Sequence, residues 1–153
     1  MDLILWRHAE AEDEHEGLHD LERALTHRGE KQAARVAGWL DRHLPEGTRI
    51  LSSPARRCEQ TALALGRKYK VRDALAPGAT VDDLLETAQW PSARHVVLVV
   101  GHQPVLGDTI GRLLRIEGGT SPVRKGAVWW LRTRERDGQT QTVLWAVQSA
   151  ETC

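Results

Sequence analysis

The chain has 153 residues, of which 41% are hydrophobic and 27% charged, and its formal net charge at pH 7 is zero. This length is typical of one domain with its own core, and a neutral chain has no overall field to attract nucleic acid or an anionic membrane. Two cysteines are too few for a disulfide framework, and no apolar run resembles a signal peptide or a membrane span, so we expect a cytoplasmic protein.

The first third of the chain predicts a strand, a loop and a helix. Residues 3–6, LILW, form a short apolar run that predicts a buried strand. Residues 9–25 are acidic and weakly periodic, which indicates a loop. Thr26 is expected to cap a helix whose apolar residues recur at i, i+3, i+4 and i+7 from Ala33, and Pro45 and Gly47 should end it.

The middle of the chain predicts one strand and two helices. Residues 49–53, RILSS, read as a second strand. Ser53 and Pro54 should then start a helix over residues 55–69, with the serine as cap and the proline at the first position. Another helix is expected at 81–90, after the loop APGAT.

The last third predicts a central strand, a helix and a hairpin. Residues 95–102, HVVLVVGH, indicate a strand buried on both faces, followed by a helix over 104–114. Asp137-Gly138 is a hairpin turn signal between two strand-like segments, whose tryptophans (Trp129, Trp130 and Trp145) we assign to the core. The order predicts an α/β three-layer sandwich: a mostly parallel central sheet, helices on both faces and a C-terminal antiparallel hairpin at the edge.

Residues 15–19, HEGLH, match the zinc-binding pattern H-E-x-x-H, so a zinc hydrolase is one alternative. The surrounding segment argues against it. Only two aliphatic residues lie between positions 11 and 24, and Gly17 weakens the helix that such a site requires. We favour a solvated loop here and expect no metal site.

Polar residues follow three of the predicted strands at the point where each strand ends. Arg7 and His8 follow the first, the segment SSPARRCEQTA follows the second, and His102 follows the third. The carboxyl ends of parallel strands meet at one edge of a sheet, where such folds bind ligands. Arginine donates a planar fork of N–H groups to phosphoryl oxygens, and the start of a helix adds further N–H donors. Together these residues indicate a site for a phosphoryl group.

The three motifs resemble those of the histidine phosphatase superfamily. They are Arg7-His8 after an N-terminal strand, S-P-x-x-R-x-x-Q-T at 53–61, and G-H-x-P at 101–104. The resemblance covers about residues 3–115, and the acidic segment running into RALTHRG is similar to that of SixA-type phosphohistidine phosphatases. It implies a single histidine phosphatase domain over residues 1–153, without the cap domain that many relatives insert.

The resemblance implies that His8 is the nucleophile and that Arg7, Arg57 and His102 complete the phosphate pocket. Arg57, not Arg56, stands four residues after the serine of the motif, so we expect Arg56 to be exposed. His8 would attack through an unprotonated ring nitrogen, because the arginines disfavour the imidazolium form. Water would then hydrolyse the phosphohistidine intermediate, and no metal or other cofactor is implied.

The proton donor to the leaving group is the open part of this interpretation. Relatives that act on phosphate esters carry a glutamate where this chain has RDALAPGAT, which contains no acidic residue after Leu75. The nearest substitutes are Glu10, Asp20 and Glu86. We favour Asp20, with Arg23 as its partner or as an additional phosphate contact; the alternative is that both are solvated.

A departing imidazole needs a proton less than a departing alkoxide does, and an uncapped site suits phosphohistidine on a protein surface. The expected activity is therefore metal-independent removal of phosphate from a phosphohistidine-bearing protein, such as a phosphotransfer domain or phosphocarrier. The alternatives are a small-molecule phosphomonoesterase of the same superfamily and a catalytically silent phosphate-binding module.

Overall fold

The computed structural model describes residues 1–153 and contains one six-stranded sheet. The strands are β1 (Asp2–Arg7), β2 (Arg49–Ser52), β3 (Lys70–Val71), β4 (Val97–Gly101), β5 (Val128–Arg136) and β6 (Gln139–Gln148), in the spatial order β3-β2-β4-β1-β5-β6. The first four strands are parallel to one another, and β5 and β6 run antiparallel at one edge. The predicted mostly parallel sheet with a C-terminal hairpin at its edge is confirmed.

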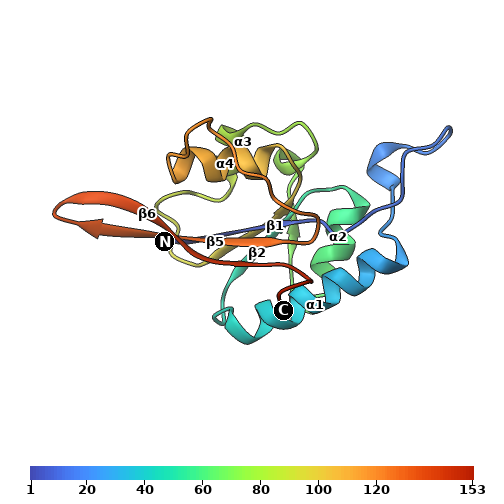
Figure 1. The fold of residues 1–153 in the computed structure, drawn as a ribbon, viewed down its shortest axis with the longest axis horizontal. Helices are drawn as coiled ribbons and strands as arrows, with labels where there is room; N and C mark the ends of the chain where they lie inside the picture. Colours follow the sequence, from blue (N-terminus) through green and yellow to red (C-terminus); the bar gives the residue numbers. More distant parts are fainter.

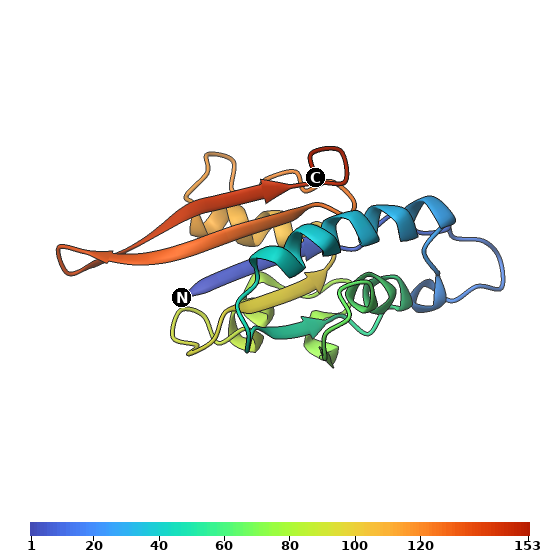
Figure 2. The same ribbon diagram turned by 90° about the horizontal axis from the view of Figure 1, so that it is seen from below.

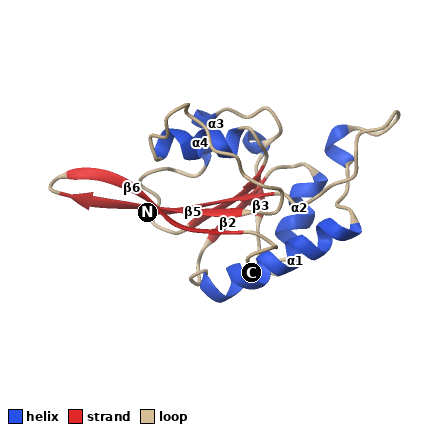
Figure 3. Cartoon of the chain, viewed as in Figure 1, coloured by secondary structure: helices blue, strands red, loops and turns tan.

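Helices cover both faces of the sheet. They are α1 (His27–His43), α2 (Arg56–Leu63), α3 (Val81–Thr87) and α4 (Val105–Leu113), with short 3-10 helices η1 (Asp20–Glu22) and η2 (Asp73–Leu75). Figures 1 and 3 show α1 and α2 on one face and α3 and α4 on the other, which confirms the predicted three layers. None of the helices combines the length and the apolar character needed to cross a bilayer.

Alternation along the central strands divides the core into two clusters. On β1, Ile4 and Trp6 pack into the cluster under α1 and α2, whereas Leu3 and Leu5 pack into the cluster under α3 and α4. All five residues of β4 are buried, as predicted for a strand covered on both faces. The sheet is therefore anchored on both sides, and its strand ends are held in a fixed register.

The helix starts show one correct prediction and one wrong one. Thr26 caps α1, since its hydroxyl accepts the N–H of Gly29 at 2.9 Å. Ser53 does not cap α2, which begins only at Arg56, after Ala55 in the N-cap position. The Ser53 hydroxyl does accept the N–H of Ala55, but its other contact is a buried histidine ring described below.

Other boundaries differ from the predictions for local reasons. Helix α2 ends at Leu63 rather than at residue 69, because Gly66 adopts a left-handed conformation with φ of +74°. Helix α3 ends at Thr87 rather than at residue 90, since Gln89 has φ of +57°. The predicted loop over 9–25 contains η1, and the two-residue strand β3 was not predicted.

The hairpin tryptophans differ in burial. Trp130 is buried and Trp129 half-buried, but Trp145 is 50% exposed, so its assignment to the core was wrong. Strand β6 is the edge strand of the sheet, and Leu144, Trp145 and Val147 on it are exposed. The ring of Trp145 packs instead under the guanidinium of Arg132, 3.8 Å from the ring centroid, and Arg132 is itself held by Asp2.

A close approach between α1 and the segment after β1 depends on a glycine. A Cβ at Gly29 would overlap the carbonyl of Glu10, whereas a Cβ at Gly38 in the same helix would meet only the end of the Arg42 side chain, at 3.7 Å. We expect Gly29→Ala to lower the free energy of unfolding by about 2 kcal/mol through overpacking. Gly38→Ala, the matched control, should raise it by about 0.5–1 kcal/mol. Urea denaturation measures both, and equal effects would contradict this account.

Candidate active site

The ends of β1, β2 and β4 lie side by side at one edge of the sheet, next to the start of α2 (Figure 2). Main-chain hydrogen bonds continue just past the strands. The N–H of His8 donates to the carbonyl of Gly101 at 3.1 Å, and that of Ser53 donates to the carbonyl of Val100 at 3.0 Å. The three predicted segments therefore meet, as their order in the sequence suggested.

The His8 ring has a defined proton position. Its Nδ1 lies 2.8 Å from the carbonyl oxygen of Ala9. A carbonyl can only accept, so Nδ1 carries the proton and Nε2 keeps its lone pair. The residue is 7% exposed. The preceding residue, Arg7, is the last of β1, and its Nη1 donates to the carbonyl of Val123 at 2.8 Å. The geometry leaves His8 an unprotonated nitrogen suited to nucleophilic attack.

Arg57 and His102 lie next to His8, as predicted. The His8 and His102 ring centroids are 5.3 Å apart, and Nη2 of Arg57 is 3.5 Å from Nδ1 of His102. Arg57 is 3% exposed, whereas Arg56 is exposed, so the choice between the two arginines agrees with their burial.

Two buried guanidinium nitrogens have no partner. Of the three buried polar side-chain atoms in the chain that lack a hydrogen bond, two are Nε of Arg7 and Nε of Arg57. A buried cationic N–H without an acceptor is costly, so each such group usually has a functional explanation. An oxyanion bound between the two arginines would supply acceptors for these donors.

Both histidines are held in the neutral form. Burial lowers the pKa of His8 to about 4, against the opposing effect of its hydrogen bond to Ala9, and the charges of Arg57, Arg7 and Arg23 lower it further. The pKa of His102 falls to about 3, again chiefly through burial, with smaller contributions from His8 and Arg57. At neutral pH, His102 can therefore offer an anion one hydrogen bond but no charge.

Asp20 reaches the site, but as a carboxylate. Its main-chain carbonyl accepts from Nη1 of Arg57 at 2.8 Å, its Oδ2 from Nη2 at 3.2 Å, and its Oδ1 from Nε of Arg23 at 3.0 Å. Burial raises the pKa of Asp20, but the hydrogen bond from Arg23 and the charge of Arg57 outweigh it and keep the pKa below its ordinary value. In this arrangement Asp20 is the counter-ion of Arg57, which runs against the predicted role of proton donor.

The remaining acidic candidates contact no predicted site residue. Glu10 interacts with Thr26 and Arg28 at the start of α1, and Glu86 lines a separate cavity with Arg49. Arg23 donates hydrogen bonds to the carbonyl of Glu12 and to the carboxylate of Asp20. It therefore links two parts of the acidic segment that contains Asp20.

The HEGLH segment does not form a zinc helix. Gly17 adopts φ of +85° within a turn, and Nδ1 of His19 accepts the N–H of Leu21 at 3.2 Å. No group of three histidine, cysteine or carboxylate side chains in the chain is placed to hold a metal ion. The zinc alternative thus lacks the geometry on which it depends.

Four residues of the 53–61 motif have contacts that were not predicted from the sequence. Thr61 Oγ1 accepts the N–H of Ala9 at 3.1 Å and donates to the carbonyl of Arg57, so it joins α2 to the residue after His8. Gln60 accepts the N–H of Leu25 at 2.7 Å. Ser53 Oγ and Cys58 Sγ lie 2.7 and 3.4 Å from Nε2 of His102. The only sequence signal for these contacts was the motif itself.

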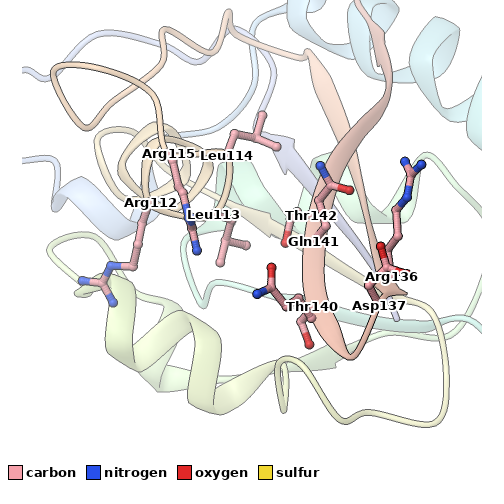
Figure 4. A pocket seen from close by; sticks show the side chains of 10 residues that line it. Arg112, Leu113, Leu114, Arg115, Arg136, Asp137, Thr140, Gln141 and Thr142 are labelled. Carbon is pink, nitrogen blue, oxygen red and sulfur yellow. The ribbon is translucent and has the colours of Figure 1, made fainter.

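One cavity lies away from the three motifs. It has a volume of about 580 Å³ and lies between the end of α4 and the tip of the β5–β6 hairpin (Figure 4). None of the three motifs contributes to it. Of its arginines, Arg112 is paired with Asp82 at 2.6 Å. Its size alone does not make it the site of the chemistry.

Comparison with known proteins agrees with the geometry. The family model of the histidine phosphatase superfamily (branch 1) matches residues 3–79. An uncharacterised protein of Picosynechococcus sp. is 36% identical over 115 residues, which cover 71% of this chain and 70% of that protein. The chain belongs to the histidine phosphatase superfamily.

Within the superfamily, similar structures are SixA proteins. One, assigned as the phosphohistidine phosphatase SixA of Nakamurella multipartitia, is 31% identical, covers 96% of this chain and 94% of its own, and superposes with a TM-score of 0.76. Another, the protein histidine phosphatase SixA complexed with tungstate, is 26% identical, covers 98% and 97%, and has a TM-score of 0.76. The resemblance to SixA-type proteins is confirmed, and the class of activity that follows is phosphatase hydrolysis.

The Asp20–Arg57 pair predicts how an anion competes for the site. Asp20→Asn removes a carboxylate from Arg57, so inorganic phosphate should bind about fivefold more tightly in calorimetric titrations. Glu22→Gln, the same charge change on η1 at an exposed residue, should leave phosphate affinity unchanged. If Asp20 instead acts only as a proton donor, Asp20→Asn would reduce turnover without changing phosphate affinity.

The neutral His8 ring predicts a pH-dependent stability. A histidine in the unfolded chain takes up a proton near pH 6.5, whereas His8 in the folded protein does so only near pH 4. The neutral His8 ring therefore contributes stability that is fully present above pH 6.5 and is lost as the pH falls toward 4. Between pH 7 and pH 5, the wild type should lose about 2 kcal/mol more unfolding free energy than His8→Gln does. Denaturant melts at both pH values measure this, and parallel losses would contradict it.

Proposed function

We propose that this protein removes phosphate from phosphohistidine on other proteins, through a covalent phosphohistidine formed on its own His8 and without a metal. The observation that carries the proposal is the His8 ring, whose Nδ1 forms a hydrogen bond with the carbonyl of Ala9 and whose Nε2 is unprotonated near the buried Arg57 and the half-buried Arg7. Membership of the superfamily and the likeness to SixA structures support it.

The proposed reaction has two transfers. In the first, the Nε2 lone pair of His8 attacks phosphorus, the new N–P bond forms, and the bond from phosphorus to the substrate imidazole breaks. In the second, water attacks phosphorus, a P–O bond forms and the N–P bond to His8 breaks. The electron pair of that bond returns to Nε2, and the phosphate leaves with the hydrogens of the water. Arg7 and Arg57 neutralise charge on the equatorial oxygens, and His102 donates one hydrogen bond.

The state of Asp20 favours phosphohistidine over phosphate esters. An alkoxide leaving group requires a proton from a nearby acid, whereas an imidazole leaves more readily without one. The carboxyl group nearest to Arg57 is that of Asp20, and its ion pairs with Arg23 and Arg57 keep it deprotonated. A site without a proton donor for the leaving group suits phosphohistidine, which is a phosphoramidate, better than a phosphate ester.

The surface beside the site is compatible with a protein substrate. A shallow groove of about 560 Å³ adjoins the site, between η1 and α2, and is lined by Leu18, Leu21, Glu22, Pro54, Arg56, Glu59, Gln60, Leu63 and Tyr69. Leu63 is 61% exposed. In our proposal residues 1–153 act as one histidine phosphatase domain without a cap, so a folded partner reaches His8 directly.

Two arginines of different burial test this proposal. With a phosphohistidine-bearing carrier protein as substrate in EDTA, we expect wild-type turnover, a loss of about 100- to 1,000-fold for the buried Arg57→Ala, and a change within twofold for Arg42→Ala, an exposed arginine of α1 outside the site and the groove. His8→Ala should be inactive and should fail to acquire the acid-labile phosphate that the wild type acquires.

Other outcomes separate the alternatives. Activity on sugar phosphates but not on the carrier protein would indicate a small-molecule phosphomonoesterase. Turnover abolished by EDTA would contradict the metal-free route, and phosphate binding without turnover of either substrate would indicate a binding module.

A further inference from the structure

Ser53 is completely buried and contacts His102, one of the residues of the proposed phosphate pocket. Its hydroxyl lies 2.7 Å from Nε2 of His102 and accepts the N–H of Ala55 at 3.2 Å. A serine hydroxyl can donate one hydrogen bond and also accept. Towards His102 it can therefore do either, according to which ring nitrogen carries the proton.

The opposite nitrogen of the same ring faces the arginine of the pocket. Nδ1 of His102 is 3.5 Å from Nη2 of Arg57. A guanidinium N–H can only donate, so this weak contact is favourable when Nδ1 is unprotonated. Without an anion, the proton then belongs on Nε2, which donates to Ser53.

An oxyanion bound at Arg57 requires the His102 proton on Nδ1 and not on Nε2. Phosphoryl oxygens only accept, so His102 helps to bind them only when Nδ1 carries the proton. The ring stays neutral, because it is buried and lies among cationic groups. The His102 ring must therefore lose the proton on Nε2 when Nδ1 gains one. Nε2 then needs a hydrogen-bond donor as its partner, whereas before it needed an acceptor.

We propose that Ser53 is a positioning residue of the phosphate site: its hydroxyl changes from acceptor to donor at Nε2 of His102 when an oxyanion binds, so that the neutral ring presents Nδ1–H to the anion. The ring loses one proton to water at Nε2 and gains one at Nδ1, so its net charge does not change. This inference rests on the proposed function, since it requires an oxyanion at Arg57.

Nitrogen-15 NMR of histidine-labelled protein tests the proposal directly, because protonated and unprotonated ring nitrogens have well-separated shifts. In the wild type we expect His102 to carry its proton on Nε2 without an anion and on Nδ1 with saturating tungstate. In Ser53→Ala, the tungstate complex should show a mixture of the two tautomers, and kcat/KM should fall about tenfold. Ser52→Ala, a buried neighbour without contact to His102, should keep the complete tautomer change.

The outcomes distinguish this inference from the proposed function. If tungstate shifts the His8 resonances while His102 keeps its proton on Nε2, the role of Ser53 is overturned and the proposed function is not. The role of Ser53 is likewise overturned if Ser53→Ala changes tautomer as completely as the wild type does. If tungstate perturbs neither ring, both proposals fail.

Discussion

The hydrogen bond between Nδ1 of His8 and the carbonyl of Ala9 is the contact on which the rest of the site depends. It determines which ring nitrogen keeps a lone pair and fixes the ring over the end of the sheet. Ala9 is held in turn by Thr61 on α2, four residues after Arg57. One helix therefore carries Arg57 and also positions the residue next to His8, so Arg57 and His8 cannot move independently.

Burial decides the electrostatics of the pocket. Two buried histidines close to arginines would be destabilised as cations, and both therefore remain neutral. The positive charge that an anion meets comes from guanidinium groups alone, which do not lose their protons at physiological pH. Asp20 balances part of that charge while no anion is present, through its ion pair with Arg57.

Much of this could be predicted from residue pattern alone. The five buried residues of β4 and the Asp137-Gly138 turn follow from periodicity and turn chemistry, and the meeting of His8, Arg57 and His102 follows from parallel strands ending at one edge. The contacts that remained hidden are those between distant segments. No periodicity shows that Asp20 pairs with Arg57, because that contact depends on how an irregular acidic segment folds back over the sheet. The same limit explains Ser53. A serine before a proline predicts a helix cap, and only the three-dimensional approach of β4 shows that its hydroxyl contacts His102 and does not cap α2.

Cys58 is the other group behind His102, and its environment has a consequence for how the enzyme responds to oxidants. Its sulfur lies 3.4 Å from Nε2 of His102, yet burial raises the pKa of the thiol to about 12. Peroxides and alkylating agents react with the thiolate, and an inaccessible thiol with so high a pKa has almost none at neutral pH. A cysteine in the pocket wall therefore does not make the site sensitive to redox conditions. A nucleophilic His8, as proposed above, would also give the enzyme a nucleophile that is not a target of the peroxides that inactivate a cysteine nucleophile.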